Sequence, residues 1–111
     1  MAENVFLINQ RINQYNPIVI FGTGMNGKRA YFTFLNMGIE VYAFADRDIK
    51  QAGKRIFGKE ILFEDNLIET DFTVVIASQA WEEISRRLGN KGIRRLFVMN
   101  MYGENDKGIQ I

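Results

Sequence analysis

The chain has 111 residues, of which 47% are hydrophobic and 24% charged, and its formal net charge is +1 at pH 7. These values suit a single globular domain over residues 1–111 and exclude a disordered chain. Cys and His are both absent, which excludes disulfides, thiolate nucleophiles, imidazole bases and the usual zinc sites, so no metal cofactor is expected. The weak net charge predicts no nucleic-acid partner.

The apolar runs of the sequence are only as long as β-strands, and no signal-peptide pattern opens it. We therefore expect a cytoplasmic protein without direct membrane insertion. No internal repeat and no low-complexity linker divides the chain.

Two elements are predicted before the first glycine. Apolar residues recur at helical spacing near the start, and they are Val5, Ile8, Ile12 and Tyr15. This pattern predicts an amphipathic lead-in helix over residues 3–14, which ends before Pro17. The apolar run 18–21 is rich in β-branched residues, as expected for a strand that is buried on both faces of a parallel sheet.

The middle of the chain alternates between helix and strand. A second amphipathic helix follows the first glycines and is closed by Gly38 in a left-handed cap. Residues 39–45 form the predicted second strand, and residues 49–59 an exposed excursion rich in basic side chains. A short third strand over 60–63 and a brief helix over 65–68 complete this part.

The last predicted unit again pairs strands with a helix. Residues 72–77 are the fourth strand, and Ser78 is suited to cap the next helix, which we expect Gly89 to close. Residues 95–99 form the fifth strand, and residues 100–111 read as a polar tail. Short connections between such units demand right-handed crossovers and hence parallel strands. The expected fold class is α/β, with a five-stranded parallel sheet in the order 3-2-1-4-5 between helical layers.

The segment Gly22-Thr23-Gly24-Met25-Asn26-Gly27 fits the pattern G-x-G-x-x-G directly after a buried strand. It opens a helix, and an acid, Asp46, follows it by about twenty residues at the end of the second strand. Gly22 would allow a tight turn, Gly24 would let a diphosphate approach the backbone, and Gly27 would let helix and strand pack closely. This combination predicts a Rossmann-like nucleotide-binding core over residues 18–99.

Ten residues are predicted to contact the nucleotide: Gly22, Thr23, Gly24, Met25, Asn26, Gly27, Asp46, Arg47, Ala77 and Ser78. The helix N-terminus favours an anion, and Asp46 is an acceptor for ribose hydroxyls. NAD and NADP both stay open, because Asp46 suits a free 2′-hydroxyl and Arg47 a 2′-phosphate. The alternative is that the glycines only make a close turn between strand and helix.

A P-loop is a second interpretation of the same turn, since Gly22 to Lys28 fits the first seven positions of G-x-x-x-x-G-K-[ST]. Arg29 does not fit the eighth position of this pattern, because it cannot bind Mg²⁺ as a hydroxyl does.

The sequence also offers no candidate catalytic residues: the Tyr-x-x-x-Lys pair of short-chain dehydrogenases does not occur. The chain alone is expected to bind rather than to catalyse, and no catalytic residue is assigned.

Three further motifs carry a resemblance to a known family. Phe44-Ala45-Asp46 fits F-x-D, Gly53 to Ile61 fits G-x-x-x-x-G-x-x-I/V, and Val74 to Ser78 reads V-V-I-A-S. With the glycine turn, these motifs resemble the Rossmann-like domain of bacterial polysaccharide-biosynthesis proteins, which stands at the N-terminus of nucleotide-sugar dehydratases and dehydrogenases and of sugar N-acetyltransferases. The resemblance implies NAD(P) or a nucleotide-sugar as the ligand, without implying a reaction.

Three functions follow from these observations. The first is a nucleotide-binding module for NAD(P) or a nucleotide-sugar in polysaccharide or cell-surface sugar biosynthesis. The second is a non-catalytic assembly or regulatory domain that uses the fold for protein contacts, and the third is an autonomous nucleotide-sugar dehydrogenase. A homodimer and a further domain of a longer protein both stay open as partners.

Overall fold

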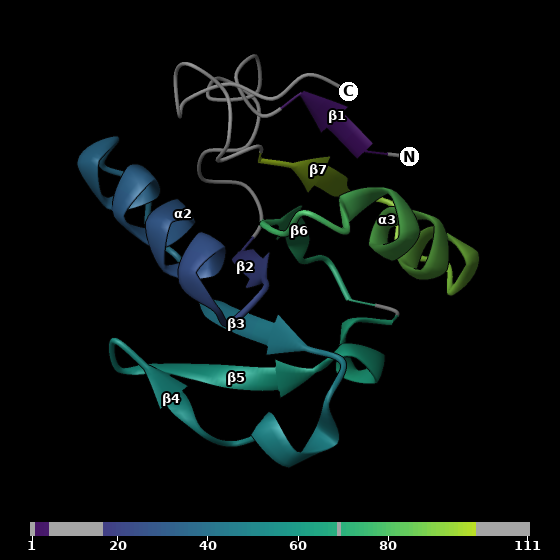
Figure 1. Cartoon of the computed structure of the whole chain (residues 1–111), viewed down its shortest axis with the longest axis horizontal. Helices are drawn as coiled ribbons and strands as arrows, with labels where there is room; N and C mark the ends of the chain where they lie inside the picture. The colour runs from purple at the N-terminus through teal and green to yellow at the C-terminus, as the bar shows by residue number, and fades with distance from the viewer. Residues whose placement is uncertain (1, 5–16, 69, 100–111) are drawn as a thin grey trace.

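A mostly parallel sheet of seven strands lies at the centre of the fold, in the order β1-β7-β6-β2-β3-β5-β4 (Figure 1). The computed structural model describes residues 2–4, 17–68 and 70–99. The strands are β1 (Ala2–Asn4), β2 (Ile18–Phe21), β3 (Ala43–Asp46), β4 (Arg55–Ile56), β5 (Lys59–Phe63), β6 (Thr73–Ile76) and β7 (Leu96–Val98). Six of them pair in parallel, and β4 pairs antiparallel with β5.

Two α-helices in the described part cover opposite faces of the sheet, as Figure 1 shows. They are α2 (Met25–Asn36) and α3 (Trp81–Asn90), and the short 3-10 helices are η1 (Ile49–Gln51) and η2 (Glu64–Leu67). The connection from β2 to β3 and the one from β6 to β7 run in opposite directions across the sheet. Since parallel crossovers are right-handed, their helices must lie on opposite faces. The predicted α/β class is confirmed.

The strand count and the complete order differ from the predicted five strands in the order 3-2-1-4-5. The five predicted segments occupy consecutive places, β5-β3-β2-β6-β7, and the two edge strands were not predicted. Strand β1 has only three residues and β4 only two, too few to show an alternating pattern. Glu3 and Asn4 lie in β1, so the predicted helix over 3–14 is wrong at its start; residues 5–14 of that helix and the tail 100–111 lie outside the described residues.

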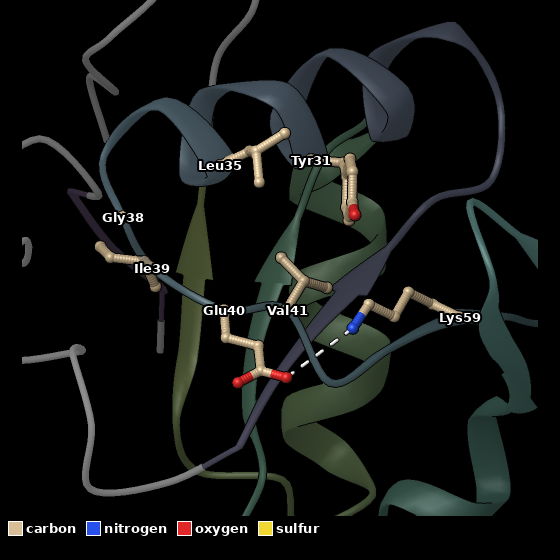
Figure 2. A pocket seen from close by; sticks show the side chains of 7 residues that line it. All are labelled: Tyr31, Leu35, Gly38, Ile39, Glu40, Val41 and Lys59. Carbon is tan, nitrogen blue, oxygen red and sulfur yellow. Dashed lines mark ion pairs between the residues drawn. The ribbon is translucent and has the colours of Figure 1, made fainter.

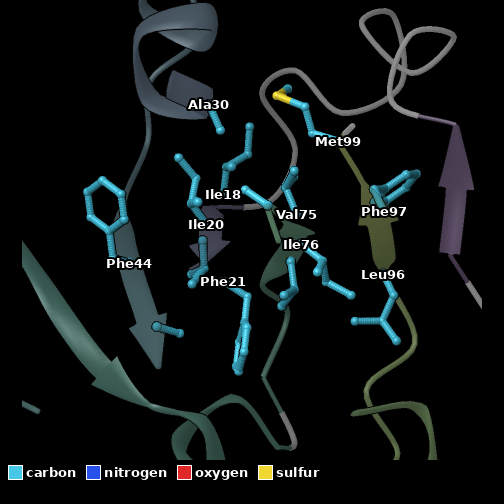
Figure 3. Packing of buried hydrophobic residues seen from close by; sticks show 14 of the residues in the cluster. Ile18, Ile20, Phe21, Ala30, Phe44, Val75, Ile76, Leu96, Phe97 and Met99 are labelled. Carbon is cyan, nitrogen blue, oxygen red and sulfur yellow. The ribbon is translucent and has the colours of Figure 1, made fainter. Parts of the chain in front are cut away.

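The core is built from the β-branched runs of the central strands. All four residues of β2 and all four of β6 are buried, because helices cover a doubly wound sheet on both faces. Figure 3 shows side chains of β2, β3, β6 and β7 packed together, with Ala30 pointing from α2 toward them. A rigid sheet of this kind fixes the positions of the loops at its edges.

Both helices end in the same left-handed motif. In α2, Gly38 has φ +75°, its N–H donates to Leu35 O at 3.0 Å, and the N–H of Ile39 donates to Phe34 O at 2.9 Å. These are the two bonds of a Schellman motif, so the predicted cap at Gly38 is confirmed. Because Ile39 belongs to this cap, β3 begins at Ala43 rather than at residue 39.

The limits of α3 differ from the prediction at both ends. Its N-cap is Ala80, and the Ser78 hydroxyl accepts from the N–H of Ala80 at 3.1 Å in a turn before the helix. Gly89 lies inside the helix, and Gly92, with φ +95°, closes it. The N–H of Gly92 donates to Gly89 O at 3.0 Å. The helix therefore ends in a left-handed cap at Gly92, and the prediction that Gly89 closes it is wrong.

Candidate functional site

The turn after β2 brings three strands into close contact. The N–H of Gly22 donates to Ala45 O in β3 at 3.1 Å, and a Cβ placed on Gly22 would lie 2.6 Å from Ala77 O, just past β6. Gly22 also has φ +135°, a conformation that side chains rarely permit. The chain therefore needs glycine where β2 leaves the sheet between its two neighbours.

Gly27 joins the turn to the helix that follows it. A Cβ on Gly27 would lie 1.9 Å from the carbonyl oxygen of Gly22, far inside any permitted contact. This confirms that Gly27 allows α2 to pack closely on the end of β2.

Gly24 has a different environment from both. It is the N-cap of α2 with φ −90°, and apart from its own atoms and those of its two chain neighbours, nothing lies within 4 Å of where its Cβ would be. No side chain caps this end of the helix, and its first turn holds no acid. The first N–H groups of a helix have no partner inside the helix and carry partial positive charge. The φ angle of Gly24 does not require glycine, and the missing side chain leaves open the approach to a helix end that favours an anion.

Asp46, the last residue of β3, is hydrogen-bonded to the glycine turn. Thr23 Oγ1 donates to Asp46 Oδ2 at 2.7 Å, and the backbone N–H of Asp48 donates to Asp46 Oδ1 at 2.8 Å. A carboxylate has about four acceptor positions, so two remain for other donors. The two bonds fix the orientation of the carboxylate beside the start of α2.

A hollow of about 240 Å³ lies beside this carboxylate, where β2, β3 and β6 all end. It is lined by Phe21, Gly22, Asp46, Arg47, Ser78, Ala80, Glu83, Ile84 and Arg87. Of the ten predicted residues, the hollow brings together Gly22, Asp46, Arg47 and Ser78. The carboxyl ends of parallel strands are where open α/β sheets receive ligands.

The other predicted residues lie around the hollow rather than in its wall. Thr23 reaches it through its bond to Asp46, and Gly24, Met25, Asn26 and Gly27 form the start of α2. Ala77 is buried, and its carbonyl oxygen faces Gly22. These placements give the geometry of the predicted site, and nucleotide contacts at these residues stay a prediction.

Sequence reasoning missed the wall that α3 contributes. Ala80, Glu83, Ile84 and Arg87 line the hollow, and their spacing places them on one face of a helix. That spacing is visible in the sequence. It could have been linked to the site, since α3 follows the strand that ends there.

An ion-pair network around the buried Glu64 holds Arg87 at the wall of the hollow. Glu64 in η2 is only 3% exposed and accepts from Arg87 Nε at 3.2 Å and Arg87 Nη2 at 2.9 Å. Glu64 also accepts from Lys91 Nζ at 2.5 Å, and Arg87 Nη1 donates to Glu83 at 2.5 Å. Burial alone would raise the pKa of Glu64, but the hydrogen bonds from Arg87 and Lys91 outweigh it and hold this pKa below its usual value. The bond to Glu64 raises the pKa of Arg87, and the bonds to Asp65 and then to Glu64 raise the pKa of Lys91.

Residues 14–99 match the family model described as C2185-like, N-terminal. The chain belongs to this C2185-like family. No curated protein has a sequence that matches this C2185-like domain significantly.

Solved structures of RSP, a Rex-family repressor, resemble the C2185-like domain. One has a TM-score of 0.57 at 19% identity and covers 84% of this chain and 48% of that chain. RSP in complex with β-NAD+ and operator DNA gives 0.58 at 16% identity, covering 86% and 48%, and RSP with β-NADH gives 0.52 at 18%, covering 81% and 48%. The domain spans about half the length of these structures, and at such identity the likeness shows the fold.

These findings correct the predictions about partners and context. The prediction that excluded nucleic acid is wrong, because RSP, which has the same fold, was solved with operator DNA. A low net charge of the isolated domain did not justify that exclusion. The matches give no support to a role in polysaccharide biosynthesis or to nucleotide-sugars as ligands.

Among residues 2–4, 17–68 and 70–99, no helix is long and apolar enough to cross a membrane. In the same residues, no group of three or more His, Cys, Asp or Glu side chains could hold a metal ion.

Proposed function

We propose that this C2185-like domain is a regulatory module that binds NAD(H) at the carboxyl edge of its sheet. The observation that carries this proposal is the 2.7 Å hydrogen bond from Thr23 to Asp46. It joins the glycine turn, which suits a diphosphate, to the carboxylate, which suits a ribose. This bond directly joins two parts of the proposed site that are distant in sequence.

Each part of a dinucleotide has a place in this arrangement. The diphosphate would lie against the start of α2 at Gly24, where no described atom fills the space beside the backbone. The ribose hydroxyls would donate to the remaining acceptor positions of Asp46. The base would enter the hollow of about 240 Å³ between Arg47 and Ile84. The helix end, the free acceptor positions of Asp46 and the hollow support the proposal that this edge binds a dinucleotide.

A regulatory role is favoured over a catalytic one by the chemistry of the hollow. Its Arg87 is already paired with Glu64 and Glu83, so it is not arranged as an acid or as an anion clamp. The sequence contains no His, no Cys and no Tyr-x-x-x-Lys pair, which leaves no usual proton donor for a dehydrogenase. The likeness to a repressor that was solved with β-NAD+ and with β-NADH supports the same role.

Calorimetric titration with NAD+ and NADH tests the proposal, with NADP+ and a UDP-sugar as competing ligands. We expect Gly24→Val to weaken NAD(H) binding at least about tenfold, because its side chain fills the space beside the helix end. Gly89→Ala is the matched control: it lies inside α3, where an added Cβ meets only Leu96 Cδ1, at 3.9 Å, and it should bind as the wild type does.

Two results would refute the proposal. One is the absence of heat and of thermal stabilisation with NAD+ and NADH at millimolar concentration. The other is a Gly24→Val variant that binds as tightly as the wild type. Binding of the UDP-sugar alone would instead restore the nucleotide-sugar hypothesis and exclude NAD(H).

A further inference from the structure

Three exposed apolar side chains and one half-buried tyrosine lie together on α2 and the β4–β5 turn. We call this surface the α2 face; it consists of Tyr31, Phe32, Leu35 and Phe57. The rings of Tyr31 and Phe57 stack with their centroids 4.8 Å apart, and Phe32 meets Phe57 edge-on at 5.0 Å. Phe32 is 47% exposed, Phe57 45% and Leu35 56%. Aromatic residues in such a position are typical of the centre of a protein interface.

Phe57 occupies a backbone position that disfavours it. Ile56 pairs with Lys59 across a two-residue turn, and both central residues have positive φ, +53° at Phe57 and +77° at Gly58. Asn-Gly is the usual sequence at such a turn. An aromatic residue held in this conformation and half exposed is strained in the isolated chain. Strain of this kind points to a role for Phe57 beyond closing the turn.

A hollow of about 280 Å³ lies next to this aromatic ridge, on the same face. Figure 2 shows Tyr31 and Leu35 on α2 at one side of this hollow and Val41, Glu40 and Lys59 at the other. The rim carries an acid and a base, Glu40 and Lys59, with Lys59 Nζ 3.8 Å from Glu40 Oε2. An exposed ion pair of this length adds little to the stability of the monomer.

We propose that a second copy of this chain docks on the α2 face through a two-fold axis. A two-fold interface must be self-complementary, and this face carries both a projecting ridge and a hollow to receive it. The same axis brings Glu40 of each copy beside Lys59 of the other, so the rim charges attract. Phe32, Leu35 and Phe57 offer on the order of 300 Å² of apolar surface per copy, which is less than a stable dimer buries, so we expect the dimer to be weak.

Sedimentation equilibrium of the full chain from about 10 µM to about 0.5 mM tests the proposal. We expect a reversible monomer–dimer equilibrium in which Leu35→Lys raises the dimer Kd at least about tenfold. The matched control is Ile49→Lys, since Ile49 is 64% exposed but lies in η1, outside the α2 face; its Kd should stay within about twofold of the wild type. Circular dichroism checks that both variants fold.

A charge exchange tests the two-fold geometry independently. Glu40→Lys and Lys59→Glu should each weaken the dimer about fivefold, because like charges then face each other across the axis. The double variant should return to the wild-type Kd. A wild-type chain that stays monomeric at about 0.5 mM overturns the proposal. So do equal effects of Leu35→Lys and Ile49→Lys, or a double variant no tighter than the single ones.

Discussion

Replacing Gly27 with alanine places a methyl group where the turn and the helix touch. The new Cβ would lie 1.9 Å from the oxygen and 2.7 Å from the carbon of the Gly22 carbonyl. Ordinary contacts begin at 3.4 Å, so the two backbones must separate by about 1.5 Å in a densely packed interior. The obstacle is backbone and cannot rotate away, as a side chain would.

The cost follows from what this separation would disturb. Moving α2 away from β2 loosens Ala30 and Phe34, which are both fully buried against the sheet. Overpacking that side chains can absorb costs about 1–3 kcal/mol. A backbone collision exceeds that, so we expect Gly27→Ala to lower the free energy of unfolding by at least about 3 kcal/mol. In a domain of this size, that loss lowers Tm by more than about 10 °C.

Urea denaturation followed by circular dichroism measures this difference. Gly24→Ala is the control in the same turn: its Cβ meets nothing within 4 Å, and the altered N-cap should cost no more than about 1 kcal/mol. If Gly27→Ala unfolds within about 1 kcal/mol of the wild type, or if Gly24→Ala is the less stable of the two, the close packing of turn and helix is refuted.

Two further variants probe the polar contacts. Glu64 has a lowered pKa in the folded state, so the stability it contributes is present above its usual pKa of 4.5 and is lost as the pH falls through its lower folded value. Glu64→Gln should cost about 1–3 kcal/mol at pH 7, since it weakens the bonds to Arg87 and Lys91, and should flatten the acid limb of a plot of stability against pH; an unchanged limb would contradict the ion-pair network. Thr23→Val removes the donor to Asp46 and should weaken NAD(H) binding about tenfold with little loss of stability, while Thr23→Ser keeps it; equal affinity in the two variants would show that the hydroxyl does not position the carboxylate.

The sequence was sufficient to predict the centre of the fold, because each central element carries a local signal. The runs that became β2 and β6 are continuous and β-branched, a pattern that fits strands covered on both faces. The glycine turn specified where β2 ends and α2 begins. Gly38 then specified where α2 ends. In each of these cases, a residue type that favours a particular backbone conformation lies where the structure has that conformation.

The errors occurred where tertiary packing decides. Gly89 and Gly92 are both able to end α3, and only the structure shows that Gly92 takes the positive φ. Strand β1 depends on its partner β7, which is distant in sequence, and its polar residues give no strand pattern. The turn at Phe57 was invisible because its sequence is not one that such turns favour.

In the candidate site too, some contacts could be predicted from the sequence and others depend on tertiary packing. Asp46 and the glycine turn could be expected to meet, since both follow neighbouring parallel strands. The pairing of Glu64 with Arg87 joins residues 23 positions apart, and nothing local in either segment indicates it. That pairing holds the Arg87 side chain at the wall of the hollow. The acceptor for a ligand was therefore predictable, and the spacing of the α3 residues could have indicated the wall, but the ion pair that holds Arg87 there was not predictable.

The antiparallel strand β4 also changes how the sheet meets other molecules. A parallel sheet that ended at β5 would expose a row of unpaired backbone groups, which invites other chains to add strands and aggregate. Strand β4 is only two residues long; with the loop before it, it covers β5 from Lys59 to Ile61 and offers little edge of its own. Arg55 at this margin is charged and donates through Nη1 to the carbonyl oxygen of Gly58 at 2.9 Å. The hairpin thus lets the protein present an aromatic surface nearby while protecting its sheet from edge-to-edge fibre growth.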